Sequence, residues 1–202
     1  MSADNPDAVA PTSGPRTNRD RTESTRAALM DAARDLFVRQ GYGDTSTPQV
    51  VAAAGITRGA LYHHFADKRD LFRAVVAREM QQMADEIRSA APQGLPPGQA
   101  LRAGSDAYLQ AMTAPGRTRL LLVDGPAVLG MVAVRAMDAA TAGATLAEGL
   151  AAAGVKPPGV SAAVLADLLS AAFDRAALAV EAGADIRAQQ AAMAWLLEQV
   201  VG

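Results

Sequence analysis

The 202-residue chain is half apolar but only 4% aromatic, so it can bury a core, it is not largely disordered, and close-packed helices are favoured over sheets. It has no cysteine, which excludes disulfides, thiolate zinc sites and cysteine nucleophiles. The net charge is −2, but residues 16–78 carry eleven Lys and Arg against seven Asp and Glu, whereas residues 79–202 carry eight against twelve. A basic N-terminal third on an acidic remainder is typical of a DNA-binding head joined to a second module.

Residues 1–20 have no hydrophobic periodicity and are rich in Pro, Ala, Ser, Thr and Asn, which predicts a disordered arm. The arginines near its end either reach a minor groove or belong to a solvated tail: Arg16, Arg19 and Arg21. No secretory signal is present in this segment, and the longest apolar stretch, 120–134, is interrupted and shorter than the roughly 20 residues of a spanning helix. The sequence therefore predicts a soluble, cytoplasmic protein with no membrane partner.

A first helix is expected over 24–40, because apolar residues recur on one face and Gly41 follows as a C-terminal cap. The second helix begins at either of two caps. Ser46 with Gln49 fits a capping box, whereas Thr47 followed by Pro48 fits an N-cap with Pro in the first turn.

A glycine turn at Gly55 precedes a short third helix, which Thr57 caps and which buries Leu61 and Phe65. Asp67 then caps a longer helix over 67–90. After a Pro- and Gly-rich break at 91–98, further helices are expected at about 98–113, 115–123, 126–153, 158–182 and 186–201.

These elements predict an all-α fold with three parts. The expected divisions are a disordered arm at 1–20, a three-helix helix-turn-helix DNA-binding domain at 21–66, and a helical regulatory domain at 67–202.

The helix after Gly55 carries outward residues that a buried structural helix would not carry: Arg58, Gly59, Tyr62, His63 and His64. A helix laid in the major groove of double-stranded DNA needs such donors for base edges and phosphates. Arg58 is the candidate for contacting a guanine base, because its guanidinium can donate hydrogen bonds to O6 and N7 at the same time. The full set of expected DNA-binding residues is Ser46, Thr47, Thr57, Arg58, Gly59, Ala60, Tyr62, His63 and Lys68.

Within that set, Gly59 and Ala60 allow close approach of the backbone, Tyr62 and His63 donate to phosphates, and Lys68 is expected to clamp a phosphate. Two alternatives stay open, because Tyr62 suits a core position and His64 suits packing between helices equally well. Adjacent histidines point about 100° apart on a helix, and no cysteine or third histidine completes a ligand set. No metal site and no cofactor are expected.

The segment TSTPQVVAAAGITRGALYHHFADKRDLF resembles the DNA-binding segment of TetR-family transcriptional regulators, over about residues 22–75. The resemblance implies a homodimeric repressor that binds a palindromic operator and is released by a small-molecule effector in its C-terminal domain. It also implies that the last two helices pair with those of a partner subunit.

For the dimer interface, the larger side chains and small residues of these two helices are the candidates: Leu165, Leu169, Ala172, Ala176, Met193, Trp195 and Leu196. For the ligand pocket, the candidates are Tyr108, Met112, Leu121, Leu122, Met131, Met137 and Phe173. Few charges occur in this region, so the expected effector is mostly apolar.

The alternative function is a similar DNA-binding regulator without a small-molecule ligand, controlled by a protein partner or by abundance. An enzyme is not expected, because both histidines lie in the helix-turn-helix and the sequence has no paired carboxylates or phosphate-binding loop.

Overall fold

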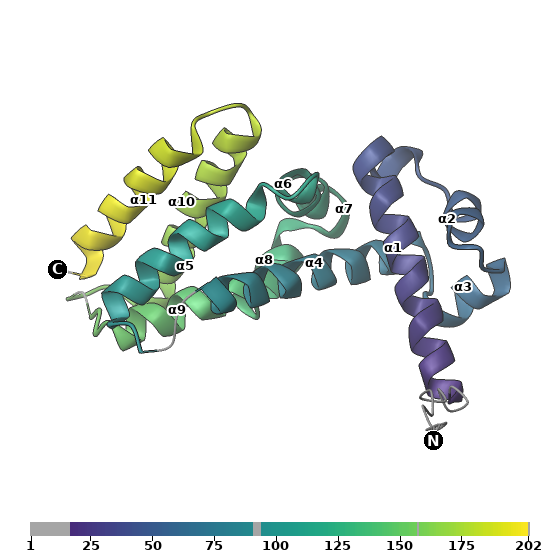
Figure 1. Ribbon diagram of the computed structural model, residues 1–202, viewed down its shortest axis with the longest axis horizontal. Helices are drawn as coiled ribbons and strands as arrows, with labels where there is room; N and C mark the ends of the chain where they lie inside the picture. Colours follow the sequence, from purple (N-terminus) through teal and green to yellow (C-terminus); the bar gives the residue numbers. More distant parts are fainter. Residues whose placement is uncertain (1–16, 91–93, 157, 202) are drawn as a thin grey trace, which may run out of the picture.

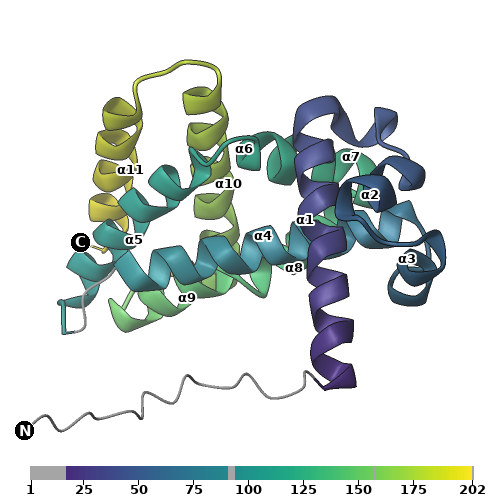
Figure 2. The same ribbon diagram turned by 45° about the vertical axis from the view of Figure 1, so that its right-hand side comes forward.

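The computed structural model describes residues 17–90, 94–156 and 158–201, and within these ranges the chain is helical with no strand. Figure 1 shows two parts. Helices α1 (Asn18–Asp44), α2 (Thr47–Ala54) and α3 (Arg58–His64) form a head at one end. Helix α4 (Lys68–Ala90) runs from the head into a body formed by the remaining helices, as the turned view in Figure 2 also shows.

Helix α1 begins at Asn18, six residues before the expected start at Ser24. Thr17 caps it: its hydroxyl accepts from the backbone N–H of Asp20, and the Asp20 carboxylate accepts from the N–H of Thr17. The predicted arm is therefore too long at its C-terminal end, because this capping box starts the helix inside it. Residues 1–16, including Arg16, lie outside the described residues.

Gly41 interrupts α1 where a C-terminal cap was expected, at φ 82°, a conformation in which glycine avoids the strain of a side chain. Of the two caps proposed for α2, the structure has the Ser46 capping box, with the Gln49 side chain accepting from the Ser46 N–H at 2.8 Å. The predicted cap of α3 is confirmed, since Thr57 Oγ1 accepts from the backbone of Ala60 at 3.3 Å.

The head has its own apolar core, to which each of its helices and the start of α4 contribute. Its most buried members are Leu29, Ala33, Phe37, Val50, Leu61, Phe65, Leu71 and Phe72. The rings of Phe37 and Phe72 meet edge to face with centroids 5.1 Å apart. This core fixes α2 and α3 against α1, although neither short helix could bury enough surface alone.

The body consists of α5 (Pro97–Met112), α6 (Arg117–Arg119), a π-helical turn η1 (Leu120–Asp124), α7 (Gly125–Leu129), α8 (Met131–Ala139), α9 (Ala142–Ala152), α10 (Ala162–Glu181) and α11 (Ile186–Val201). The prediction of one helix over 126–153 is wrong. Gly130, at φ 91°, ends α7, and a second break follows at Ala140 and Thr141. These two breaks divide the segment into three short helices, which pack on one another in chain order.

Helices α10 and α11 lie side by side on the edge of the body away from α2 and α3 (Figures 1 and 2). Helix α4 packs on both α1 and α5, so a shift of the body can reach the head through this helix. Within the described residues, no helix is both long and apolar enough to cross a bilayer.

Candidate functional site

Helix α3 has two chemically different faces. Leu61 is fully buried and Phe65, directly after the helix, is 2% exposed, whereas Arg58, Tyr62 and His63 are exposed on the other side. The buried pair anchors the helix to the head core. The opposite face therefore presents a guanidinium, a phenol and an imidazole to solvent from a rigid support.

The exposed polar groups of α2 and α3 form one continuous surface. The guanidinium of Arg58 lies 5.5 Å from the centroid of the Tyr62 ring, and the Tyr62 hydroxyl lies 3.5 Å from Thr47 Oγ1. Hydrogen bonding to Thr47, followed by that to Arg58, lowers the pKa of Tyr62. Tyr62 is 45% exposed, so its alternative placement in the core is wrong.

His64 has a different environment from its neighbour His63. It is half-buried, with its ring centroid 6.3 Å from that of Phe65, over which Arg26 of α1 places its guanidinium at 5.2 Å. Burial, with the nearby charges of His63 and Arg26, lowers the pKa of His64, which favours the neutral form of this imidazole. The structure thus favours the packing role for His64.

Lys68 is placed differently from the expected phosphate clamp. Its ammonium donates to the carbonyls of Tyr42 and Thr45, each at 2.8 Å, and lies 3.5 Å from that of Gly43 and 4.2 Å from the Tyr42 ring centroid. These contacts use its three donors at the C-terminal end of α1, where a cation is also favoured by the helix dipole. Lys68 ties the start of α4 to the end of α1.

We therefore expect Lys68→Met to lower the free energy of unfolding by about 1–3 kcal/mol, because it leaves partly buried carbonyls without a donor. Urea denaturation measures this loss, and Arg73→Met, an exposed change on the same helix, is the control. The salt dependence of DNA binding should be unchanged. If Lys68→Met instead lowered the slope of log binding constant against log salt concentration by about one per head, with normal stability, Lys68 would be assigned to a phosphate contact.

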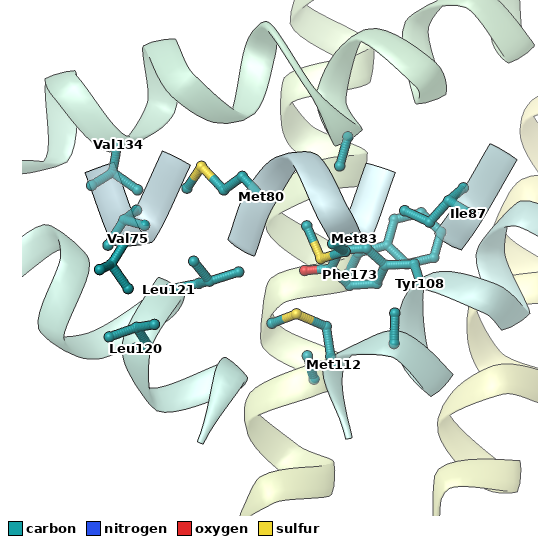
Figure 3. Close-up of a cluster of buried hydrophobic side chains, with 14 of the residues drawn as sticks. Val75, Met80, Met83, Ile87, Tyr108, Met112, Leu120, Leu121, Val134 and Phe173 are labelled. Atoms are coloured by element: carbon teal, nitrogen blue, oxygen red, sulfur yellow. The ribbon is translucent and has the colours of Figure 1, made fainter. Parts of the chain in front are cut away.

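A second feature is a cavity of about 740 Å³ in the body, bounded by α4, α5, η1 and α8 to α10. Five predicted pocket residues line it: Tyr108, Met112, Leu121, Leu122 and Met131. Phe173 and Tyr108 line an adjoining cavity of about 230 Å³, and Met137 lines neither cavity. Figure 3 shows the apolar side chains at this place, with Met80 and Met83 coming from α4 and Met112 from α5.

Carboxylates that are not among the pocket residues expected from the sequence also line the cavity. Tyr108 donates its hydroxyl to Asp174 at 2.6 Å, and Ser170 donates to Asp138 at 3.0 Å. Burial is the main cause that raises the pKa of both carboxyls, that of Asp174 to about 6. A usable signal was present in the sequence, since Asp174 directly follows the candidate pocket residue Phe173 and Ser170 lies one helical turn before it.

A buried ionic network joins the head to the body. Glu79 of α4, 2% exposed, accepts from Arg34 of α1 at 2.7 Å and from Arg117 of α6 at 3.2 Å. Arg117 is itself buried and also donates to both carboxylate oxygens of Glu86. The sequence signal is that Glu79 interrupts an apolar stripe, four residues after Val75 and four before Met83.

The candidate interface residues fall into three groups by their exposure. Leu169, Ala176 and Met193 are buried within the protomer, so they offer a partner little surface. Leu165 and Ala172 are half-buried, whereas Trp195 and Leu196 are exposed. Two exposed side chains of α10 were missed, Val164 and Leu168, which are 54% and 61% exposed.

The chain matches two family models, one for each part of the structure. Residues 29–75 match the bacterial regulatory proteins of the tetR family, and residues 98–202 match the tetracyclin repressor-like C-terminal domain. The first match contains α2 and α3, and the second contains the cavity-forming helices from α5 onward together with α10 and α11.

The chain is also similar to individual regulators. It is 43% identical over 60 residues to the HTH-type transcriptional regulator AcrR of Shigella flexneri and 38% identical over 63 residues to the HTH-type transcriptional repressor BepR of Brucella suis. These matches span 30% and 31% of this chain and 28% and 30% of those relatives. A TetR-family transcriptional regulator from Pectobacterium atrosepticum is 31% identical, with a TM-score of 0.65 and coverage of 91% of this chain and 95% of that one.

Proposed function

The chain belongs to the TetR family of transcriptional regulators, and on this premise we propose that it is a homodimeric repressor which binds a palindromic operator and is released by a small molecule. The observation that carries the DNA-binding part is the exposed polar face of α3, held rigid by the buried Leu61 and Phe65. Because it would bind chromosomal DNA, the protein would act in the cytoplasm. The proposed division between head and regulatory domain is at 66/67, directly before α4.

In the proposed complex, the N-terminal part of α3 enters a major groove. Arg58 contacts a guanine. Gly59 has no side chain and Ala60 has only a methyl group, so the helix can approach the base edges closely. Phosphates would be contacted around this groove by the two helix starts and the exposed α3 side chains: Ser46, Thr47, Thr57, Tyr62 and His63. The contact between Arg58 and Tyr62 restricts the guanidinium before DNA arrives.

The Arg58→Ala variant tests this assignment. We expect it to weaken operator binding by about 1–3 kcal/mol and to relax the preference at one base position of each half-site, because it removes a bidentate base contact. The promoter next to the gene is first searched for a palindrome that the protein binds. Fluorescence anisotropy with that site, and with single-base variants of it, measures both effects. The control is Arg187→Ala, which removes an exposed arginine from α11. An equal loss of operator affinity in both variants would show that the affinity depends on net charge alone and not on a base contact by Arg58.

Dimerisation is proposed through α10 and α11, which leave four large apolar side chains exposed on the edge of the body: Val164, Leu168, Trp195 and Leu196. Burying them against a second copy would remove them from water. A two-fold dimer also explains a palindromic operator, since two recognition helices roughly 34–36 Å apart contact successive turns of one major groove.

The proposed release is a shift between two dimer conformations. A ligand in the cavity contacts α4 through Met80 and Met83, and α4 also packs on α1 of the head. A ligand that prefers the conformation with wrongly spaced heads would depopulate the DNA-binding one. A nearly complete switch needs about 5 kcal/mol of differential affinity.

A further inference from the structure

We propose that the cavity binds an apolar molecule carrying one protonated nitrogen, which lies between Asp138 of α8 and Asp174 of α10. This inference rests on the proposed ligand-gated function and names the chemical class of the ligand. It replaces the expectation of a mostly apolar effector with that of a lipophilic cation.

The two carboxylates are incompletely paired by the protein. Each accepts one hydrogen bond from an uncharged hydroxyl, Tyr108 for Asp174 and Ser170 for Asp138. An ionised carboxylate has about four acceptor positions, so both retain free lone pairs on the cavity wall. A ligand N–H group can therefore be accepted without displacing either hydroxyl.

The two carboxylates also lack an ion-pair partner within the described part of the protein. Among the residues that the structure describes, no Lys or Arg forms an ion pair with Asp138 or Asp174. Two arginines line the same cavity: Arg135 is paired with the exposed Asp167, and Arg175 forms no ion pair with either carboxylate. The neighbouring carboxylates, Asp167 for Asp138 and Asp138 for Asp174, add to burial in raising both pKa values. A bound cation would relieve this repulsion.

The adjoining cavity contains an unsatisfied hydroxyl. Ser105 of α5 is 4% exposed, its Oγ has no hydrogen-bond partner, and it lines the 230 Å³ cavity. Tyr108 and Ser170 line both cavities, so the two spaces meet at the hydroxyls that hold the carboxylates. A buried polar group without a partner is costly, and a polar atom at the far end of a ligand would satisfy Ser105.

The remaining lining determines the rest of the ligand. Met80, Met83 and Met112 offer flexible apolar contacts, and the rings of Tyr108 and Phe173 meet edge to face at 5.4 Å. An anion would be repelled by the carboxylates, and a neutral molecule would leave their charge uncompensated. The combination favours an aromatic or aliphatic body with an ammonium group.

Three probes of one shape and different charge test the proposal: 9-(aminomethyl)anthracene, 9-anthracenemethanol and 9-anthracenecarboxylate. Binding to the full-length protein without DNA is followed by anthracene fluorescence at pH 7.5. We expect the amine to bind at least about tenfold more tightly than the alcohol, as one hydrogen bond to a charged group would give, and the carboxylate to bind most weakly.

Asp138→Asn and Asp174→Asn should each reduce the preference for the amine while leaving alcohol affinity within about twofold, which also shows that the variants are folded. The control is Glu148→Gln, an exposed change on α9 that removes the same charge at a residue that lines neither cavity. Equal binding of amine and alcohol, failure of the amine to bind at millimolar concentration, or a preference that survives both Asn changes would overturn the proposal.

The preference should also fall as the pH is lowered through about 6, where Asp174 gains a proton and can no longer pair with an ammonium. The titratable and charged groups facing the two cavities are Arg88, Tyr108, Arg135, Asp138, Asp167, Asp174 and Arg175. A preference that is unchanged from pH 7.5 to pH 5 would count against the carboxylates. If the amine binds as expected but does not release DNA, this inference stands and the ligand-released function fails.

Discussion

Glu79→Gln should lower the free energy of unfolding by about 3–5 kcal/mol, because it removes the charge that lies between two arginines. Arg117 would keep its guanidinium buried with Glu86 as its remaining charged partner, and Arg34 would lose its contact from α1 to α4. Denaturation in urea at pH 7 measures the loss. Glu86→Gln is the matched control: its side chain is 49% exposed, so we expect a loss of about 1 kcal/mol or less.

The pH dependence gives an independent check. Burial opposes the ionisation of Glu79, but Arg34 and Arg117 outweigh it and hold its pKa below the ordinary value of 4.5. A carboxyl with a lowered pKa stabilises the fold fully above its unfolded value and loses that contribution as the pH falls through its folded value. The difference between wild type and Glu79→Gln should therefore shrink below about pH 4.5. If the difference in unfolding free energy stayed constant with pH, the loss would come from altered packing and not from the removed charge.

Trp195→Glu should convert the proposed dimer to a monomer, because it buries a carboxylate in the apolar contact between two copies of α11. Operator affinity should then fall by about 10²–10⁴-fold, since a second head tethered to the first binds at a high effective concentration. Light scattering coupled to size-exclusion chromatography gives the mass, and anisotropy gives the affinity.

The matched control is Val132→Glu, the same change in polarity at an 86%-exposed position on α8. This variant should remain dimeric with unchanged operator affinity. A dimeric Trp195→Glu protein would place the interface elsewhere on the molecule. A monomeric one with normal operator affinity would instead contradict the proposal that both heads bind together.

The head could be predicted in most of its detail because its signals are local. A helix cap joins residues three apart, as in Ser46 with Gln49 and Thr57 with Ala60, and a glycine turn needs only one residue. The outward face of α3 follows from helical spacing once Leu61 and Phe65 are placed inside. The arm boundary was misplaced because the Thr17 capping box was overlooked.

The charged interior of the body could not be predicted from spacing. Asp174 and Tyr108 are 66 positions apart, and Arg34 and Glu79 are 45 apart, so their pairing depends on how α10 packs on α5 and how α1 packs on α4. The role of Lys68 also depends on packing that spacing along the sequence does not reveal. Its position suited a phosphate contact, but the packing of α4 on α1 directs its ammonium to the carbonyls that end α1.

The sequence by itself determined the helical class, the position of the helix-turn-helix and the chemistry of its exposed face, since each depends on residues within a few positions of one another. Only the tertiary structure decided which side chains of α10 and α11 remain exposed, where the cavities lie, and that the half-buried Asp138 and Asp174 line the same cavity. The physical reason is that burial and pairing depend on which helices meet. A helix of known amphipathic pattern can pack in several ways, and contacts distant along the chain select one.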